Sequence, residues 1–363
     1  MGWWEISACT TGFFSDSGPT EAQTVMHADR IVARFIEQAL SGIHGARRRM
    51  LGAVVWAAMS GSMLSLSRLA RGMTRSGGSC RAALERVDRL VGSARVAQDA
   101  EEVARALLAR LCRWLSPLVI AVDGSAATPG GTFVELRAAV VWLGMGRGLT
   151  VSQRVYAAAL QGNGKTERAL LRDLSRWVPK GTRVIVISDA GFRTPWFRAV
   201  ERLGWGWIGR VRRGNQVRHG DGVWQDAVGW AHRAPAQAWR LADARLTQPE
   251  RMACDLVRVK RLPTGRRRHR CPGHGPSPKA DAEARTSARE PWVLAHSTGL
   301  RDLRADEIVT RPKIAPGHVW PLDACDCFEV GKAARVGHGG LISPAPPGSL
   351  TAEYGSRLTG APA

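Results

Sequence analysis

Two aspartates follow short, continuous apolar runs and are the residues of this chain best placed to do chemistry. Asp123 ends the run Leu118–Val122, and Asp189 ends the run that begins with Val184–Ile187. Such runs are typical of strands buried on both faces of a sheet. A lone aspartate there commonly caps the following turn. Two that meet could instead share a pair of Mg²⁺ ions about 4 Å apart, an arrangement suited to phosphodiester chemistry.

The elements around these aspartates predict that the two side chains meet. Strands are expected over 118–122, 133–143, 149–155, 184–187 and 205–211, with helices over 166–177 and from Thr194 to about Leu203, where Pro195 suits the first helical position. Three antiparallel strands followed by strand–helix crossovers predict an α/β fold with a ribonuclease H-like mixed sheet. In that order the first and fourth strands are neighbours, which puts Asp123 and Asp189 at one end of the sheet.

Residues 26–116 precede these strands and have the apolar spacing of helices. Asp99 and Glu102 resemble a capping box, which predicts the start of the last of these helices. The region also carries several arginines, which favour a DNA-binding domain; the alternative is an ordinary helical domain with a solvated basic face. These arginines are the run Arg47–Arg49 and the pair Arg68 and Arg71.

The remaining segments divide by composition. Residues 117–211 form the first part of the core, 212–290 predict a β-rich insertion with a basic loop at Thr264–Arg270, and 291–309 return to the core. The tail, 310–363, has 7 Pro and 8 Gly in 54 residues, a share typical of low-order sequence. Residues 1–25 contain no Lys or Arg and indicate a mis-called start or a disordered segment rather than a signal peptide.

Net charge points to a polyanionic partner. Lys and Arg total 52 against 31 Asp and Glu, for a formal charge of +21. An excess of this size favours a nucleic acid as the partner over a membrane surface. A charged, soluble surface is the simpler alternative. No apolar run reaches the roughly 18–20 residues that span a bilayer. The seven scattered cysteines fit a reducing cytoplasm rather than a disulfide scaffold or a zinc site.

Three segments resemble the DDE transposases of bacterial insertion sequences, in the insertion-sequence-four family with its Tyr-Arg-Glu-Lys signature. They are Ile120–Ser125, Ile187–Phe197 and Gly204–Arg212, and Arg86–Leu90 and Glu290–Ala295 are similar as well. The resemblance extends from about residue 26 to residue 309. It implies a ribonuclease H-like core split by a β insertion, and a nucleoid-associated enzyme of the bacterial cytoplasm that cleaves and transfers DNA strands.

The resemblance also implies roles for single residues. Asp123 and Asp189 match the first two members of the catalytic triad that binds Mg²⁺, or Mn²⁺ in its place. Arg193, Arg210, Arg212 and Trp292 are the implied DNA-binding residues. Trp292 stands where hairpin-forming relatives stack a flipped base, and a core tryptophan is the alternative. The implied partner is double-stranded DNA at the terminal inverted repeats, and the resemblance leaves room for a homodimer.

The third carboxylate of the triad is missing from its expected place. No Tyr-x2-Arg-x3-Glu-x6-Lys pattern follows Asp189, and Glu329 is the best-placed substitute by distance along the chain. A frameshift or recombination near Thr310 would explain both this loss and the change of composition. Two hypotheses follow: a transposase by descent whose tail still completes the site, or a catalytically inactive remnant that binds DNA. An unrelated basic RNA-binding protein is a third.

Overall fold

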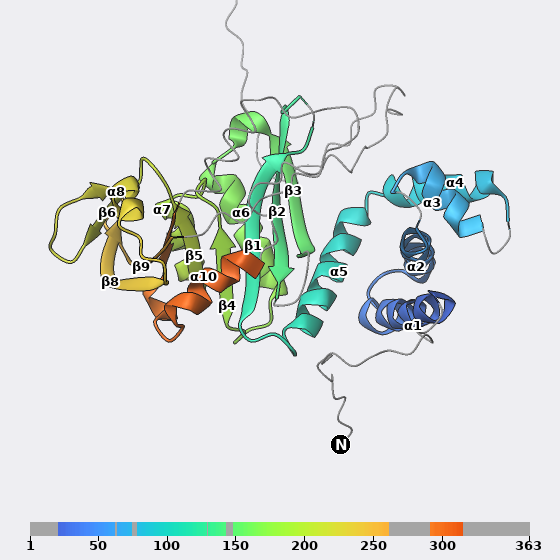
Figure 1. Cartoon of the computed structure of the whole chain (residues 1–363). Helices are drawn as coiled ribbons and strands as arrows, with labels where there is room; N and C mark the ends of the chain where they lie inside the picture. Colours follow the sequence, from blue (N-terminus) through green and yellow to red (C-terminus); the bar gives the residue numbers. More distant parts are fainter. Residues whose placement is uncertain are drawn as a thin grey trace, which may run out of the picture. The chain divides into compact units, whose positions relative to one another are not determined.

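Figure 1 shows the computed structural model of the chain, which describes residues 21–61, 64–74, 78–128, 130–142, 148–260 and 291–314. The expectations for residues 1–20, for the basic loop at Thr264–Arg270 and for the tail beyond Ile314 lie outside these residues. None of the helices in the described ranges is long and apolar enough to cross a membrane.

Five helices precede the sheet. They are α1 (Glu21–Ala39), α2 (Gly45–Met59), α3 (Leu66–Met73), α4 (Cys80–Val91) and α5 (Val96–Leu111). The capping box expected at Asp99 is wrong, because α5 begins three residues earlier and Arg95 holds the N-cap position. Asp99 instead accepts a 2.6 Å hydrogen bond from Nε of Arg47. A carboxylate in the first turn also suits the positive end of the helix dipole.

The sheet has the predicted core order. Its strands are β1 (Leu118–Ala126), β2 (Phe133–Val141), β3 (Leu149–Ala157), β4 (Val184–Ser188), β5 (Gly206–Val211), β6 (Gln216–His219), β7 (Gln225–Asp226), β8 (Trp239–Leu246), β9 (Met252–Val259) and β10 (Trp292–His296). They lie in the order β3-β2-β1-β4-β5-β10-β9-β8-β6-β7. The β1–β4 and β4–β5 pairs are parallel and the other pairs are antiparallel. The first five strands thus form a ribonuclease H-like mixed sheet, as expected.

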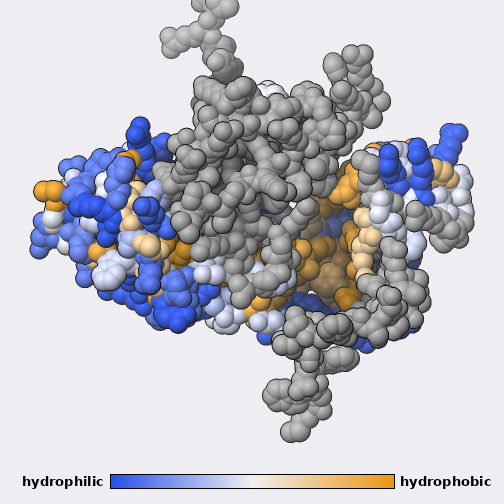
Figure 2. All heavy atoms as spheres, in the orientation of Figure 1, coloured by the Kyte–Doolittle hydropathy of each residue, from blue (hydrophilic) through white to orange (hydrophobic). Residues whose placement is uncertain are grey.

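Residues between β5 and β10 extend this sheet rather than forming a separate one. β9 pairs directly with β10, and β8, β6 and β7 continue outward, with α8 (Ala227–His232) after β7. The surface over this part is predominantly hydrophilic with separate apolar spots (Figure 2), and Val223 and Trp239 are exposed there. The predicted β-rich character is therefore present, but as an extension of the core sheet.

The two faces of the sheet are covered by different helices. On one face, which we call the α6–α7 face, Ile120, Val122 and Val186 pack with α5, α6 (Gly164–Trp177) and α7 (Thr194–Arg202). On the other, the α10 face, alternate residues such as Ala121 and Ile187 pack with η3 (Thr298–Leu300) and α10 (Ala305–Ile314). Side chains alternate between the two faces along a strand, so even-numbered residues of β1 and β4 lie on the α6–α7 face and odd-numbered ones on the α10 face.

Two helix boundaries differ from the sequence expectation. Arg193, not Thr194, holds the N-cap position of α7, because the Thr194 hydroxyl is buried against that of Thr247 at 3.0 Å. α10 runs through the boundary expected at residue 309. Ile308 and Val309 are buried in the core of the α10 face, and this packing holds the helix past the point where the composition changes.

Candidate active site

Asp123 and Asp189 lie on neighbouring parallel strands and on the same face of the sheet. In the β1–β4 register, Val122 is opposite Ser188, so the two aspartates follow at the next position of each strand, where strand spacing is about 4.8 Å. Asp123 is two residues after Ala121, and Asp189 is two residues after Ile187. Because side chains alternate along a strand, both carboxylates lie on the α10 face with these two core residues. The two aspartates therefore occupy adjacent positions on neighbouring strands, as the strand order predicts.

The expectation that Asp123 ends its strand is wrong. β1 continues three residues further, because Gly124, Ser125 and Ala126 keep their pairing with β2. Asp123 therefore lies within the pairing of β1 with β2, opposite Arg137, and the residue is only 7% exposed. Asp189, by contrast, follows the last residue of β4 and is half-buried.

Backbone amides hold one oxygen of each carboxylate. Oδ1 of Asp123 accepts a hydrogen bond of 2.9 Å from the amide of Gly124, and Oδ1 of Asp189 accepts one of 2.8 Å from the amide of Gly191. A Cβ at position 191 would lie 3.0 Å from that Asp189 oxygen, so glycine suits this turn. The turn-capping role of Asp189 is real, and it orients the carboxylate on the α10 face.

Both carboxylates resist ionisation. Burial raises the pKa of Asp123 to about 7, with a further contribution from the negative charge of Asp189, while the Gly124 amide and Arg137 act in the opposite direction. Burial also raises the pKa of Asp189, against the Gly191 amide and the charges of Arg212 and Arg210. Two buried carboxylates that repel each other are stabilised by a nearby cation, and such perturbed pairs are common in functional sites.

Two arginines at the end of β5 and a tryptophan of β10 lie on the α10 face, on the Asp189 side of the pair. Arg210 and Arg212 alternate with buried Val211 on β5, and the Arg210 guanidinium lies 5.8 Å from the ring centroid of Trp292. Arg210 is only 7% exposed, so it supports Trp292 and Asp189 from within the fold. Arg212 and Trp292 are more accessible. Of the four residues implied to bind DNA, Arg210 and Arg212 thus lie near Asp189, and Trp292 lies beside Arg210.

The structure does not bring Arg193 to this cluster, and it adds Arg137. Arg193 is exposed at the start of α7, and its charge acts on Glu167 of α6. Arg137 lies on β2 directly opposite Asp123. Sequence reasoning missed Arg137, although a signal was available. Side chains alternate between the two faces along β2, so every second residue of β2 must lie on the same face as Asp123.

The donor set fits one divalent cation. Carboxylate oxygens are hard ligands, and Mg²⁺ is commonly held by one or two of them with water filling its other positions. Among the described residues, no group of three His, Cys, Asp or Glu side chains converges. Glu135 is close enough to raise the pKa of Asp123, but it forms an ion pair with Arg137. Glu329 lies outside the described residues.

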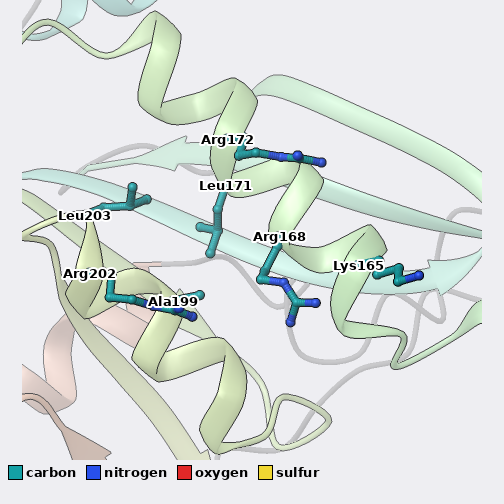
Figure 3. Close-up of a pocket in the computed structure, with 7 residues that line it drawn as sticks. All are labelled: Lys165, Arg168, Leu171, Arg172, Ala199, Arg202 and Leu203. Atoms are coloured by element: carbon teal, nitrogen blue, oxygen red, sulfur yellow. The ribbon is translucent and has the colours of Figure 1, made fainter. Parts of the chain in front are cut away.

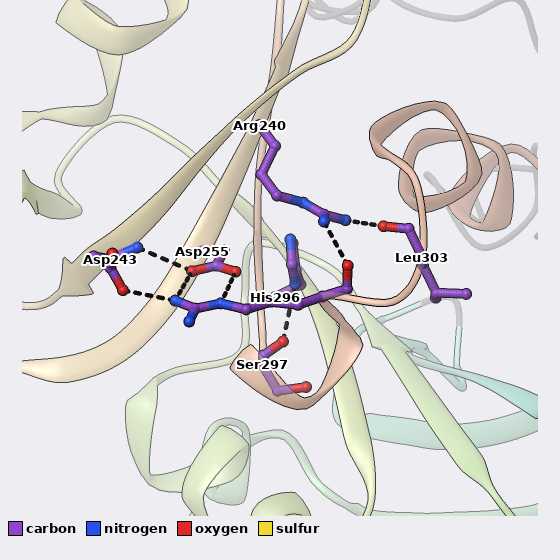
Figure 4. A network of polar contacts seen from close by, with 7 residues as sticks. Arg240, Asp243, Asp255, His296, Ser297 and Leu303 are labelled. Carbon is purple, nitrogen blue, oxygen red and sulfur yellow. Dashed lines mark hydrogen bonds and ion pairs between the residues drawn. The ribbon is translucent and has the colours of Figure 1, made fainter.

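A second polar cluster on the α10 face secures the connection from β10 to α10 (Figure 4). Asp255 of β9 is fully buried and accepts hydrogen bonds of 2.8 Å from Nε and a terminal nitrogen of Arg301. Arg240 donates to the carbonyl oxygens of Arg301 and Leu303. His296, whose pKa burial lowers, contacts the Ser297 carbonyl at 2.9 Å. These contacts attach η3 to the sheet, and α10 follows it.

Comparison with known proteins gives only distant structural similarity. No family model and no curated protein matches the sequence. A piggyBac transposase in a synaptic complex with hairpin DNA is similar over 83% of this chain and 66% of that one, with 12% identity and a TM-score of 0.38. An Argonaute from A. aeolicus is similar over 56% of this chain and 25% of that one, with 11% identity and a TM-score of 0.28. This chain thus spans less than two thirds of each. The fold assignment follows from the strand order of the sheet itself.

Proposed function

We propose that this chain is a DNA-binding protein of transposase descent, whose core holds one divalent cation between Asp123 and Asp189. The observation that carries the proposal is the pairing of these carboxylates on adjacent parallel strands, within reach of the charges of Arg137, Arg210 and Arg212. Carboxylates alone would repel a phosphate. Arginines beside them supply the complementary charge that a bound phosphodiester needs.

Each group has a separate part in this proposal. Asp123 and Asp189 bind Mg²⁺ or Mn²⁺, which when bound would polarise a phosphate oxygen and lower the pKa of a coordinated water. Arg212 contacts the phosphate, Arg137 adds its positive charge from its ion pair with Glu135, and Trp292 offers its ring to an unstacked base. Arg210 holds Trp292 in place. This division predicts that Arg212 and Trp292 affect DNA binding directly, whereas Arg210 acts through them.

The proposed descent from the insertion-sequence-four branch rests on the sequence resemblance, and so do the terminal inverted repeats as the specific DNA. We further propose that strand cleavage and strand transfer are impaired in this chain, because the third carboxylate of the triad is missing from its expected place in the sequence. The alternative, a remnant that binds DNA without any cleavage, is favoured by the same observation. The two differ only in whether one ion supports residual cutting.

Residues 26–116 act as the DNA-binding head in this proposal. Arg68 and Arg71 are exposed on α3, whereas Arg47 is held by Asp99. The head therefore offers fewer available cations than the sequence run Arg47–Arg49 indicates, and Arg68 and Arg71 are its leading candidates for phosphate contacts.

Binding and cutting can be tested separately. Affinity for a mixed-sequence DNA duplex should fall steeply with salt, since each neutralised phosphate releases counterions; flat binding would show that the charge serves only solubility. A matched RNA duplex should bind no more tightly, and a clear preference for RNA would favour the RNA-binding alternative.

Nicking of supercoiled plasmid with Mg²⁺ or Mn²⁺ is the second assay. The chain, Asp123→Ala and Asp189→Ala should all give the same background. If the unsubstituted chain nicks the plasmid and each substitution abolishes this nicking, the site is active and our proposal of impairment is wrong.

A further inference from the structure

A basic groove between α6 and α7 is separate from the carboxylates. It has a volume of about 470 Å³ and is lined by Lys165, Arg168, Leu171, Arg172, Ala199, Arg202 and Leu203. Arg168 and Leu171 extend from α6 toward α7, which contributes Arg202 (Figure 3). Leu171 and Ala199 belong to the core of the α6–α7 face. The groove therefore lies on the side of the sheet opposite Asp123 and Asp189.

The cations of this groove are available for a ligand. Lys165, Arg168, Arg172 and Arg202 are exposed, and within the described part of the chain none of them forms an ion pair with an acidic side chain. Their neighbours differ: Arg154 and Arg176 are both paired with Asp173. The nearest acid on α6, Glu167, is half-buried, and burial raises its pKa against the charges of Arg168 and Arg193.

The spacing of the cations matches a nucleic-acid backbone. Lys165, Arg168 and Arg172 recur at positions i, i+3 and i+7, so they share one side of α6 over about 10 Å of helix. One DNA strand presents a phosphate every 3.4 Å or so along the duplex axis, which gives about three phosphates over that length. Arg202 of α7 adds a fourth cation beside the row.

The lining also favours contacts to phosphates over recognition of bases. It combines cations with aliphatic side chains and includes no aromatic ring, amide or carboxylate side chain. Stacking needs an aromatic platform, and the groove has none of the amide or acidic side chains that read adenine or cytosine edges. Cations alone contact phosphates without regard to sequence.

We propose that the α6–α7 groove binds the phosphate backbone of a second DNA segment, independently of sequence and of the segment at the carboxylates. The inference uses the proposed function only for the chemical class of the ligand. The two sites lie on opposite faces of the sheet, so one chain can contact two segments without competition between them. DNA is favoured over a small polyphosphate because all four cations are exposed and three of them lie in a row along α6.

The test compares three variants of the full chain by the slope of log affinity against log salt for a fluorescent mixed-sequence duplex. The groove variant is K165A/R168A/R172A/R202A. The control variant, R110A/R113A/K180A/R245A, removes four exposed cations elsewhere. The third variant, Arg212→Ala, reports on the carboxylate face. Thermal unfolding should be the same for the groove variant and the wild type, because alanine favours helix and the removed side chains are exposed.

The groove variant should lose about three units of slope, at roughly 0.9 for each phosphate contact, and the control variant less than one. A groove variant with the wild-type slope would overturn the proposal, and so would an equal loss in the control variant. Loss of pyrophosphate binding with the DNA slope retained would overturn it in favour of a small polyphosphate. If Arg212→Ala alone has no effect, the carboxylate-face proposal fails while the groove stands.

Discussion

Replacing Asp123 with asparagine should stabilise the folded chain at pH 8 when no divalent cation is present. The folded-state pKa of Asp123 is raised from an ordinary 3.8 to about 7. A carboxyl group with a raised pKa favours the folded state while it is protonated, and that contribution is lost as pH rises through the folded pKa. At pH 8 the folded chain therefore carries the full cost of ionising this buried group, and the neutral amide of the Asp123→Asn variant avoids that cost.

The magnitude follows from the two pKa values. About three pH units, each worth about 1.4 kcal/mol, give roughly 4 kcal/mol at pH 8 and about 2 kcal/mol at pH 5. Asparagine keeps an oxygen that can accept the Gly124 amide hydrogen bond. For a chain of this size each kcal/mol moves the melting temperature by about 2–4 °C, so Asp123→Asn should melt roughly 10 °C higher at pH 8.

Thermal unfolding followed by circular dichroism, in EDTA and then in excess Mn²⁺, provides the measurement. Mn²⁺ at about 100 times its dissociation constant should stabilise the wild type by about 2.7 kcal/mol and leave Asp123→Asn unchanged. The exposed Asp221 supplies the control, and Asp221→Asn should change stability by less than about 0.5 kcal/mol. If Asp123→Asn is no more stable than the wild type at pH 8 in EDTA, the burial argument is refuted.

Three further outcomes follow from the structure. Mn²⁺ affinity, measured by calorimetry, should rise about tenfold for each pH unit up to about 7 and then level off, because the cation displaces a proton from the carboxylates; a pH-independent affinity would contradict this. Gly209→Ala places a Cβ 2.4 Å from Cζ of Phe197 and should cost about 1–3 kcal/mol in chemical denaturation, whereas Gly299→Ala, which meets nothing within 4 Å, should be close to neutral. Trp292→Ala should weaken single-stranded DNA binding by about 1–3 kcal/mol in a titration and Trp292→Phe by much less; equal effects of the two would assign Trp292 to packing alone.

The order of strands and helices could be predicted from the sequence because its signals are local. The continuous apolar runs before Asp123 and Asp189 identify buried strands, and the spacing of Leu170, Leu171 and Leu174 identifies α6. The predicted strand order makes β1 and β4 neighbours, and the register that sets Val122 opposite Ser188 then brings the two aspartates to adjacent positions.

The partners of charged side chains could not be predicted in the same way. Asp99 pairs with Arg47, 52 positions away, rather than capping its own helix. Arg137 is opposite Asp123 only because of the β1–β2 register, and the charge of Arg193, at the start of α7, acts on Glu167 of α6. Charged groups interact with whatever the fold brings near, and that depends on register and packing across the whole chain.

Sequence by itself therefore determined the core architecture and the two carboxylates of the site, since hydrophobic periodicity is encoded within each segment. The tertiary structure alone decided that β6–β9 extend the core sheet, that Arg210 is buried against Trp292, and that four exposed cations line a groove on the opposite face. Each of these depends on residues distant in sequence meeting across strands or helices, where burial and charge are set by the neighbours that the fold supplies.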